Sequence, residues 1–365
     1  MSDQFSDGLE GVIAAQTVLS QVDGEAGRLV IRGHDLAELA GRWTFEETAH
    51  LLWQGFFADL PAGLVAPLGA ARREVFAEVA ALDPVLIGRQ PIEAMRALTA
   101  RLADGDDLAT ALRLTAAPAV FTAAVIRAQA GLAPLAPDPN LGHAADILRM
   151  ARGAPAPAAH TAALDAYLVT VIDHGLNAST FAARVVASTQ AGLTSAVLAG
   201  IGALKGPLHG GAPGPVIEML DAIGAPQNAR AWLDSALDRG DRLMGFGHRV
   251  YRVRDPRADA LKRAVDALGE GSSTLPGRLD FAEAVEAAAL RILAERKPGR
   301  SLQTNVELYT GLMLEALAFP TAAFTCVFAM GRVAGWIAHA REQALGGRLI
   351  RPQSHYVGPL PLRAA

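Results

Sequence analysis

The sequence has a single cysteine, Cys326, among its 365 residues, so no disulfide can form within the chain. So little cysteine is typical of proteins in reducing compartments, and we expect a cytoplasmic location. Aromatic residues make up only 5% of the chain, although 51% of it is hydrophobic. Alanine, leucine and valine must therefore fill the core, which favours closely packed helices over a large β-sandwich.

Neither sign of charge dominates, because 33 Lys and Arg residues face 37 Asp and Glu residues, a formal net charge of −4. Surfaces that bind nucleic acid normally carry a basic excess, so we expect no nucleic-acid partner. Residues 1–10 are polar and acidic, unlike a signal or transit peptide. Residues 185–204 carry no charge and have the length of a membrane span, but include Ser, Thr and Gln. We interpret them as a buried helix, in the core or between subunits, and expect no membrane insertion.

What the sequence does contain is mostly helical patterning. The strand signal is confined to TVLSQV and RLVIRG, which flank the turn-rich DGEAG and predict a hairpin. Thr44 and Glu47 form a capping-box pattern before an apolar helical face, and residues 279–297 repeat the helical period. Residues 132–159 are rich in Pro and Ala and are typical of a loop. The chain is therefore predicted to be all-α with a short N-terminal β-hairpin.

Polar residues interrupt this background at the ends of elements. Asn177 or Ser179 is a candidate cap for the helix after His174. Lys205 and Gly206 have the pattern of a helix C-terminus, which leaves His209 in a loop constrained by proline and glycine.

Two further clusters follow. Asp255 is placed to cap a helix that has Pro256 in its first position, with His248 in the glycine-flanked loop before it. The arginines of this segment suit a solvated basic face or an anion site: Arg249, Arg252, Arg254 and Arg257. Glu307 lies near the start of an apolar helix, where one carboxylate commonly serves the helix dipole. Each residue alone has a structural explanation, but their joint occurrence favours a functional site.

These segments resemble the citrate synthase family. The family's patterns around its catalytic histidines are similar to GPLHGG at 206–211 and GFGHRVY at 245–251, followed by DPRA. Further similar blocks occur in family order: SQVDGEAGRLVIRGHDL, NASTFAARVVAST, NVELYTG, GRVAGWIAHAREQ and IRPQSHYVGP. The resemblance extends from about residue 8 to residue 361. A single GFGH would be a weak signal, whereas ordered blocks along the whole chain are a specific one.

The resemblance implies an α-helical homodimer in which a small domain closes over substrates held by a large one. By position, the large domain comprises 1–212 and 315–365, and the small domain comprises 213–314. The uncharged segment ending at Leu204 would then lie in or near the subunit interface.

The resemblance also implies condensation of acetyl-CoA with oxaloacetate, followed by hydrolysis of citryl-CoA. Glu307 would be the base that takes a proton from the acetyl methyl, and His209 would donate to the thioester oxygen. His248 would polarise the ketone of oxaloacetate. A weak carbon acid needs such a preplaced donor for the developing enolate oxygen.

The two carboxylates of oxaloacetate call for forked guanidinium donors. The matching oxaloacetate positions are His174, Arg257, Arg332 and Arg351, the last implied to reach across from the partner subunit. The matching CoA-binding positions are Arg252, Leu243, Met244, Gly245, Phe246, Gly247 and Asn305. The resemblance implies no metal and no cofactor, with acetyl-CoA as a substrate, and the histidines lack metal-motif spacing.

Three differences from the family pattern stand out. Glu307 stands where Asp is usual, and its extra methylene matters because a displacement of about 1 Å can cost on the order of 100-fold in rate. Pro213 and Gly214 replace the usual Asn-Glu, and Gly175 replaces the commoner Glu after His174. The last two changes bear on substrate preference more than on reaction type.

Two alternatives stay open: a 2-methylcitrate synthase using propionyl-CoA, and a weakly active or non-catalytic paralogue that binds CoA and a dicarboxylate. One methylene in an apolar pocket is worth only about 1–3 kcal/mol, so the two synthases can differ in degree. The sequence has no G-x-S-x-G elbow of an esterase and no dinucleotide-binding G-x-G-x-x-G after a strand.

Overall fold

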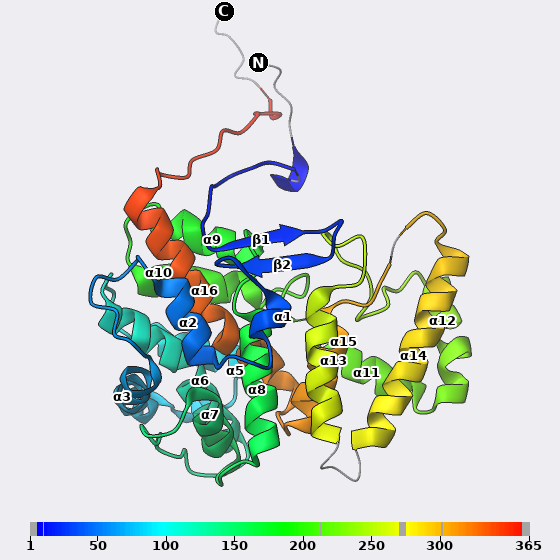
Figure 1. Cartoon of the computed structure of the whole chain (residues 1–365), viewed down its shortest axis with the longest axis horizontal. Helices are drawn as coiled ribbons and strands as arrows, with labels where there is room; N and C mark the ends of the chain where they lie inside the picture. Colours follow the sequence, from blue (N-terminus) through cyan, green and yellow to red (C-terminus); the bar gives the residue numbers. More distant parts are fainter. Residues whose placement is uncertain (1–5, 10, 212, 270–274, 301, 360–365) are drawn as a thin grey trace, which may run out of the picture.

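The structure is a computed structural model that describes residues 6–9, 11–211, 213–269, 275–300 and 302–359. It is mainly helical, as predicted (Figure 1). The α-helices are α1 Leu36–Leu39, α2 Phe45–Trp53, α3 Val65–Phe76, α4 Pro84–Ile87, α5 Pro91–Thr99, α6 Leu108–Gln129, α7 His143–Arg152, α8 Ala158–Val171, α9 Ala178–Ala187, α10 Leu193–Leu204, α11 Pro213–Ile223, α12 Ala229–Asp238, α13 Pro256–Gly269, α14 Leu275–Arg296, α15 Val306–Ala316 and α16 Phe324–Gly346. The short 3-10 helices are Asp7–Leu9, Ala77–Ala81, Pro226–Asn228 and Thr321–Ala323.

The predicted hairpin is confirmed and belongs to a three-stranded sheet. Strand β1, Ser20–Asp23, pairs antiparallel with β2, Arg28–Ile31. A third strand, β3, spans His34–Asp35 and pairs with the end of β2. The sequence did not predict β3, because two residues are too short to show strand alternation.

Two long apolar helices form the centre of the larger body of the molecule. α6 and α16 pack against each other, with α5, α9 and α10 around them (Figure 1). Both are long and apolar enough to span a bilayer, but 83% of the apolar window of each is buried inside the protein. That degree of burial is typical of core helices.

The helices α11 to α15 gather at one side of the molecule (Figure 1). α13 packs against α8 of the larger body and against α15, while α12 packs against α14. α11 begins at Pro213 and α15 ends at Ala316, whereas the predicted boundary at 314 falls within α15, and the two-domain division stays a prediction.

Two sequence interpretations are wrong in detail. The uncharged run 185–204 is not one helix, because the chain turns between α9 and α10 at Gln190 and Gly192, which have φ angles of 63° and 92°. The region 132–159 is not all loop, because it contains α7 and the start of α8. In α7 the apolar Ala144, Ile147 and Leu148 are buried, a spacing typical of a helix. The prolines around this segment led us to predict a loop instead.

Candidate active site

The loop before α13 fixes the orientation of His248. The backbone N–H groups of Val250 and Tyr251 both donate to His248 Nδ1, each over 3.0 Å. A neutral imidazole has one proton, so this proton is on Nε2. Nε2 lies 3.3 Å from Arg257 Nη2, which is also a donor. Two donors that face each other in this way are suited to an oxygen acceptor from a substrate.

Arg257 is held in place by the predicted cap of α13. Asp255 Oδ1 accepts the backbone N–H of Arg257 over 3.0 Å, which confirms the cap. The same carboxylate accepts Arg257 Nε over 3.1 Å and Nη2 over 2.8 Å. Both side chains are buried. A guanidinium fixed in this way keeps its remaining donors in one direction.

His174 lies directly beside His248. Its Nε2 is 3.2 Å from the hydroxyl of Tyr251, and the two imidazoles meet edge to face with centroids 5.5 Å apart. Burial, with Arg257 as the next cause, holds the pKa of His174 well below its usual value. Burial followed by Arg257 also lowers the pKa of His248 to about 4. Both rings are therefore neutral at pH 7.

His209 lies in the turn after α10 and contacts the start of α9. Its Nε2 is 2.8 Å from Ser179 Oγ, which also accepts from Trp336 Nε1 over 3.2 Å. The same hydroxyl donates to Asn177 Oδ1 over 2.8 Å, and this oxygen also accepts the N–H groups of Ser179 and Thr180, so Asn177 is the cap of α9. Burial, then the charges of Arg332 and Arg257, lower the pKa of His209 to about 4.

Glu307 lies in the first turn of α15, where Asn305 Oδ1 caps the helix by accepting its backbone N–H over 3.1 Å. Its Oε2 atom is buried and has no hydrogen-bond partner among the residues that the structure describes. Burial raises the pKa of Glu307, and the nearby charge of Arg257 opposes this rise. A carboxylate with weak solvation and few hydrogen bonds is a strong base once it is ionised.

Arg332 of α16 is a buried guanidinium with donors to spare. Its Nε donates to the carbonyl of Val171 over 2.6 Å, and its charge lies 5.0 Å from the ring centroid of Phe328. Its buried Nη2 has no hydrogen-bond partner within the described part of the chain. Burial lowers its pKa to about 10, so it stays charged at pH 7. Such a group is suited to bind an anion.

One electrostatic neighbourhood joins the predicted residues. The charge of Arg257 affects the pKa of His174, His209, His248 and Glu307. The residues predicted from four distant segments of the sequence are therefore close enough in the fold to share the charge of Arg257.

The sequence missed Tyr167 of α8. Its hydroxyl is buried without a hydrogen-bond partner in the ranges described. Burial raises its pKa, and the charges of Arg332, Glu307 and Arg257 also act on it. Tyr167 has the pattern of an ordinary core position in an apolar helix, so no local signal distinguishes it.

The segments predicted to contact CoA lie side by side. Gly247 N donates to Gln303 O over 2.7 Å, and Asn305 N donates to Gly245 O over 3.0 Å. Asn305 Nδ2 also donates to Gly247 O over 2.9 Å. Gly245 and Gly247 have φ angles of 87° and 82°, the left-handed region that favours glycine. Leu243 and Phe246 are buried, so this loop offers mainly its backbone and Met244 to a ligand.

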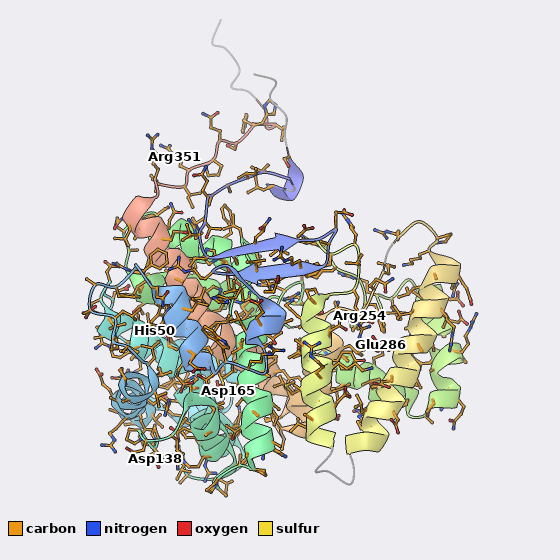
Figure 2. The ribbon with its side chains drawn as sticks, viewed as in Figure 1. His50, Asp138, Asp165, Arg254, Glu286 and Arg351 are labelled. Carbon is orange, nitrogen blue, oxygen red and sulfur yellow. The ribbon has the colours of Figure 1, made fainter. Side chains whose placement is uncertain are left out.

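Two predicted residues have exposed side chains. Arg351 is exposed in the segment after α16, far from Arg254 in Figure 2. Its predicted role in a partner subunit's site stays a prediction. Arg252 is exposed, and its backbone N–H donates to Gly24 O of the hairpin turn over 2.9 Å.

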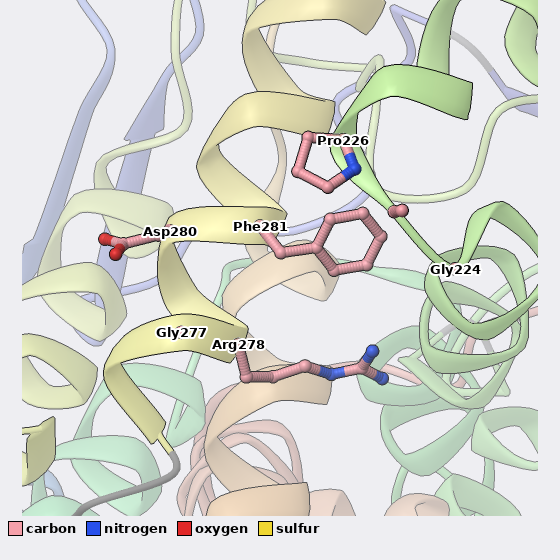
Figure 3. A pocket seen from close by; sticks show the side chains of 7 residues that line it. Gly224, Pro226, Gly277, Arg278, Asp280 and Phe281 are labelled. Atoms are coloured by element: carbon pink, nitrogen blue, oxygen red, sulfur yellow. The ribbon is translucent and has the colours of Figure 1, made fainter.

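A separate surface pocket between α11 and α14 has a volume of about 530 Å³ (Figure 3). Its cation, Arg278, is already paired with Asp221 over 2.6 Å and with Glu315 over 3.0 Å. None of the predicted site residues lines it. The described residues also contain no group of three His, Cys, Asp or Glu side chains arranged to hold a metal ion.

Gly175, one of the departures noted above, has a structural reason. Its φ angle of 57° is left-handed, and its N–H donates to Ser20 Oγ over 3.1 Å. An added Cβ would come within 3.3 Å of Val22 Cγ2. The sheet therefore packs closely on the loop that carries His174.

Neutral imidazoles with set orientations, an under-bonded carboxylate and buried guanidinium donors, all on helix ends, define a helical enzyme with a site for an anionic substrate. The sequence model described as "Citrate synthase, C-terminal domain" matches residues 8–353. The chain belongs to the citrate synthase family, an acyltransferase class of enzymes.

Individual relatives agree with this assignment. A Mycobacterium tuberculosis protein named "Putative citrate synthase 2" is 39% identical, covering 98% of this chain and 94% of the relative. A "2-methylcitrate synthase" of the same organism is 37% identical, covering 96% and 90%. The structure also matches citrate synthase from Thermoplasma acidophilum, solved as a ternary complex with carboxymethyl coenzyme A and oxaloacetate. That match has a TM-score of 0.88 and 27% identity, and covers 100% of this chain and 99% of the other.

Proposed function

We propose that the protein condenses acetyl-CoA with oxaloacetate and hydrolyses the resulting citryl-CoA to citrate and CoA. The observation that carries this proposal is the grouping of His209, His248 and Glu307 around the charge of Arg257. Relatives and structural neighbours named citrate synthase supply the reaction class.

Glu307 would take the proton from the acetyl methyl group. The developing enolate oxygen needs a donor, and His209 is suited to supply it. In the structure the Ser179 hydroxyl donates to Asn177 Oδ1 over 2.8 Å; when acetyl-CoA binds it would turn to donate to His209 Nε2, which is also 2.8 Å away. The ring proton would then be on Nδ1, free to donate to the thioester oxygen.

Oxaloacetate would be bound and activated by the neighbouring donors. The ketone oxygen would accept from His248 Nε2–H, whose tautomer is set by two backbone N–H groups. Arg257 and Arg332 would bind the carboxylates, and His174 would add a contact. Attack of the enolate carbon on the polarised ketone then forms the carbon–carbon bond, and water cleaves the citryl thioester.

CoA would lie along the loop 243–247 and the start of α15, with Arg252 near its phosphates. The glycine backbone of this loop supports the proposal, because it permits close approach by a ligand. The mechanism needs no metal or cofactor, since the thioester itself activates the acetyl group.

We also propose a homodimer, in the cytoplasm, in which Arg351 enters the partner's site. α9 and α10 pack together and carry half-buried apolar residues such as Phe181 and Leu198 on their outer faces. The chain segments at both ends expose large apolar side chains, among them Ile13 and Val357 at 89% each. Apolar surface of this kind suits a subunit interface.

The direct test measures release of free thiol from acetyl-CoA with and without oxaloacetate. We expect release that depends on oxaloacetate. Its absence at high enzyme concentration would contradict the proposal and favour a paralogue that only binds CoA and a dicarboxylate.

A 2-methylcitrate synthase is the second candidate, because relatives with this name are nearly as similar as those named citrate synthase. Initial rates with acetyl-CoA and propionyl-CoA in competition decide between the two. A clear preference for propionyl-CoA would reverse our assignment.

A further inference from the structure

Glu286 of α14 is a buried carboxylate that binds three side chains from two segments of the candidate site. Its Oε1 accepts from Thr304 Oγ1 over 2.5 Å and from Arg254 Nη1 over 2.6 Å. Its Oε2 accepts from the Tyr309 hydroxyl over 2.6 Å. The Glu286 side chain is only 9% exposed. Figure 2 shows Arg254 and Glu286 beside each other, among the helices α13 and α14.

Each of these partners is close in sequence to a predicted site residue. Arg254 immediately precedes Asp255, which orients Arg257. Thr304 immediately precedes Asn305, which caps the helix that carries Glu307. Tyr309 lies two residues after Glu307, and its ring is 5.9 Å from the guanidinium carbon of Arg254. One carboxylate therefore connects the loop before α13 with both sides of Glu307.

Thr304 is the point where the backbones of these segments meet. Its carbonyl accepts from Asp255 N over 3.3 Å, and it forms an isolated β-bridge with Phe246. Glu286 therefore holds a residue whose backbone contacts both the loop before His248 and the cap of α13. A shift of Thr304 would be transmitted to both.

Glu286 is ionised in this setting. Burial alone would raise its pKa, but the hydrogen bonds from Thr304, Tyr309 and Arg254 outweigh burial and hold the pKa below its usual value. Arg254 also pairs with Asp259 over 2.5 Å, so its charge is shared by two carboxylates. Fully bonded buried networks of this kind specify one arrangement of the groups they join.

We propose that Glu286 is a positioning residue of the active site, whose carboxylate holds the loop before α13 and the start of α15 in one arrangement. This inference rests on the proposed function. Glu286 acts through its neighbours and does not itself contact the substrate. It thereby fixes the base, Glu307, relative to the guanidinium of Arg257.

The test replaces the carboxylate by an amide of the same shape in Glu286→Gln. The matched control is Glu283→Gln, on the same helix, whose carboxylate pairs with Lys262 over 2.6 Å at the half-exposed surface. For Glu286→Gln we expect kcat per folded molecule to fall about 10-fold to 100-fold, as for a displaced catalytic group. Glu283→Gln should stay within about twofold, as is usual for a surface pair.

Thr304→Val removes one of the partners without changing charge. If Glu286 acts through Thr304, the double variant should lose less activity than the product of the two single losses, because the residues share one interaction. Independent losses that multiply would contradict the proposed route through Thr304.

Hydrogen–deuterium exchange measured by mass spectrometry reports whether the two segments stay ordered, independently of the catalytic rate. Glu286→Gln should raise deuterium uptake in peptides covering 245–257 and 302–309, and Glu283→Gln should not. Unchanged uptake together with unchanged kcat per folded molecule would overturn the proposal, even if the variant were less stable. If wild-type protein shows no oxaloacetate-dependent thiol release, the proposed function fails, and deuterium uptake alone then decides whether Glu286 positions these segments.

Discussion

Arg72 and Arg332 are both fully buried arginines, in different parts of the molecule, and they are bonded very differently. Arg72 donates to Asp146 over 2.8 Å and to the carbonyls of Leu141 and Asp138 over 2.6 and 3.3 Å. Its Nη1 also lies 3.3 Å from His143 Nδ1. Arg332 makes one hydrogen bond, to Val171 O, and its Nη2 has no partner in the described ranges.

The difference separates a structural charge from a functional one. A buried charge is tolerated when it is well bonded, and each side-chain nitrogen of Arg72 has a partner, with a second arginine, Arg149, also on Asp146. A buried guanidinium with donors left over is destabilising unless a ligand uses them. Its persistence next to the predicted histidines is therefore a sign of function.

The sharpest test of the comparison is Arg72→Met. It removes the charge and leaves Asp146 and two carbonyls short of donors, so we expect the free energy of unfolding to fall by about 3 kcal/mol. Urea denaturation of the purified protein measures this. Activity per folded molecule should stay near that of the wild type. A loss of turnover without a loss of stability would contradict the purely structural role of Arg72.

Arg332→Met should show the opposite behaviour. Loss of a buried charge contact with the substrate costs about 2–5 kcal/mol, so kcat/KM for oxaloacetate should fall on the order of 1000-fold. The free energy of unfolding should be unchanged or higher by about 1 kcal/mol, because the variant no longer buries incompletely bonded donors. Marked destabilisation with retained kcat/KM would make Arg332 a second structural arginine.

Ser179→Ala tests how His209 is oriented. Without the hydroxyl, Nε2 loses the donor proposed for the reacting complex and the Nδ1–H tautomer is no longer favoured, so kcat should fall about 100-fold, as for loss of an oxyanion donor. Steady-state thiol release measures the change. The control is Ser195→Ala, whose exposed hydroxyl bonds only Asp104 in the described region and lies on α10 away from His209.

The pH dependence follows from Glu307. The base must be ionised, and burial raises its pKa above the ordinary 4.5, so kcat should fall as the pH drops through that raised pKa. His209 and His248, with pKa values of about 4, stay neutral over this range.

The same shift affects stability with a definite sign. The folded state binds the Glu307 proton more tightly than the unfolded chain does, so this contribution to stability is complete below pH 4.5 and is lost as the pH rises through the raised pKa. Glu307→Gln should remove this dependence from urea unfolding curves and abolish the acid limb of activity. An acid limb that is unchanged in a still active Glu307→Gln would assign the base to another residue.

The smallest expected effect concerns Tyr167→Phe. Removing a buried hydroxyl that has no partner should raise the free energy of unfolding by about 1 kcal/mol. Because the hydroxyl adjoins the site charges, kcat/KM should fall about fivefold, the equivalent of one ordinary hydrogen bond. Tyr356→Phe, in the exposed C-terminal segment, is the control for both measurements.

The sequence predicted well whatever depends on neighbouring residues. The caps at Thr44 and Asp255 were predictable because side chain and backbone partner lie within three residues. The hairpin was predictable from alternation around a turn. The break between α9 and α10 was missed, because its turn residues lie inside an uncharged run. Tyr167 and Glu286 were missed because only tertiary packing brings a core tyrosine to Glu307 or a helical glutamate to Thr304.

The hairpin turn between β1 and β2 is a suitable place for a fluorescent label that reports on the loop after His248. Gly24 and Gly27 lie so close to the loop after His248 that an added Cβ would come within 2.2 Å of Val250 O and 2.6 Å of Val253 Cγ2, respectively. Glu25, between them, is exposed, and the native Cys326 is buried. A dye attached through Glu25→Cys would therefore label one place only, and its emission would follow the loop in real time as ligands arrive.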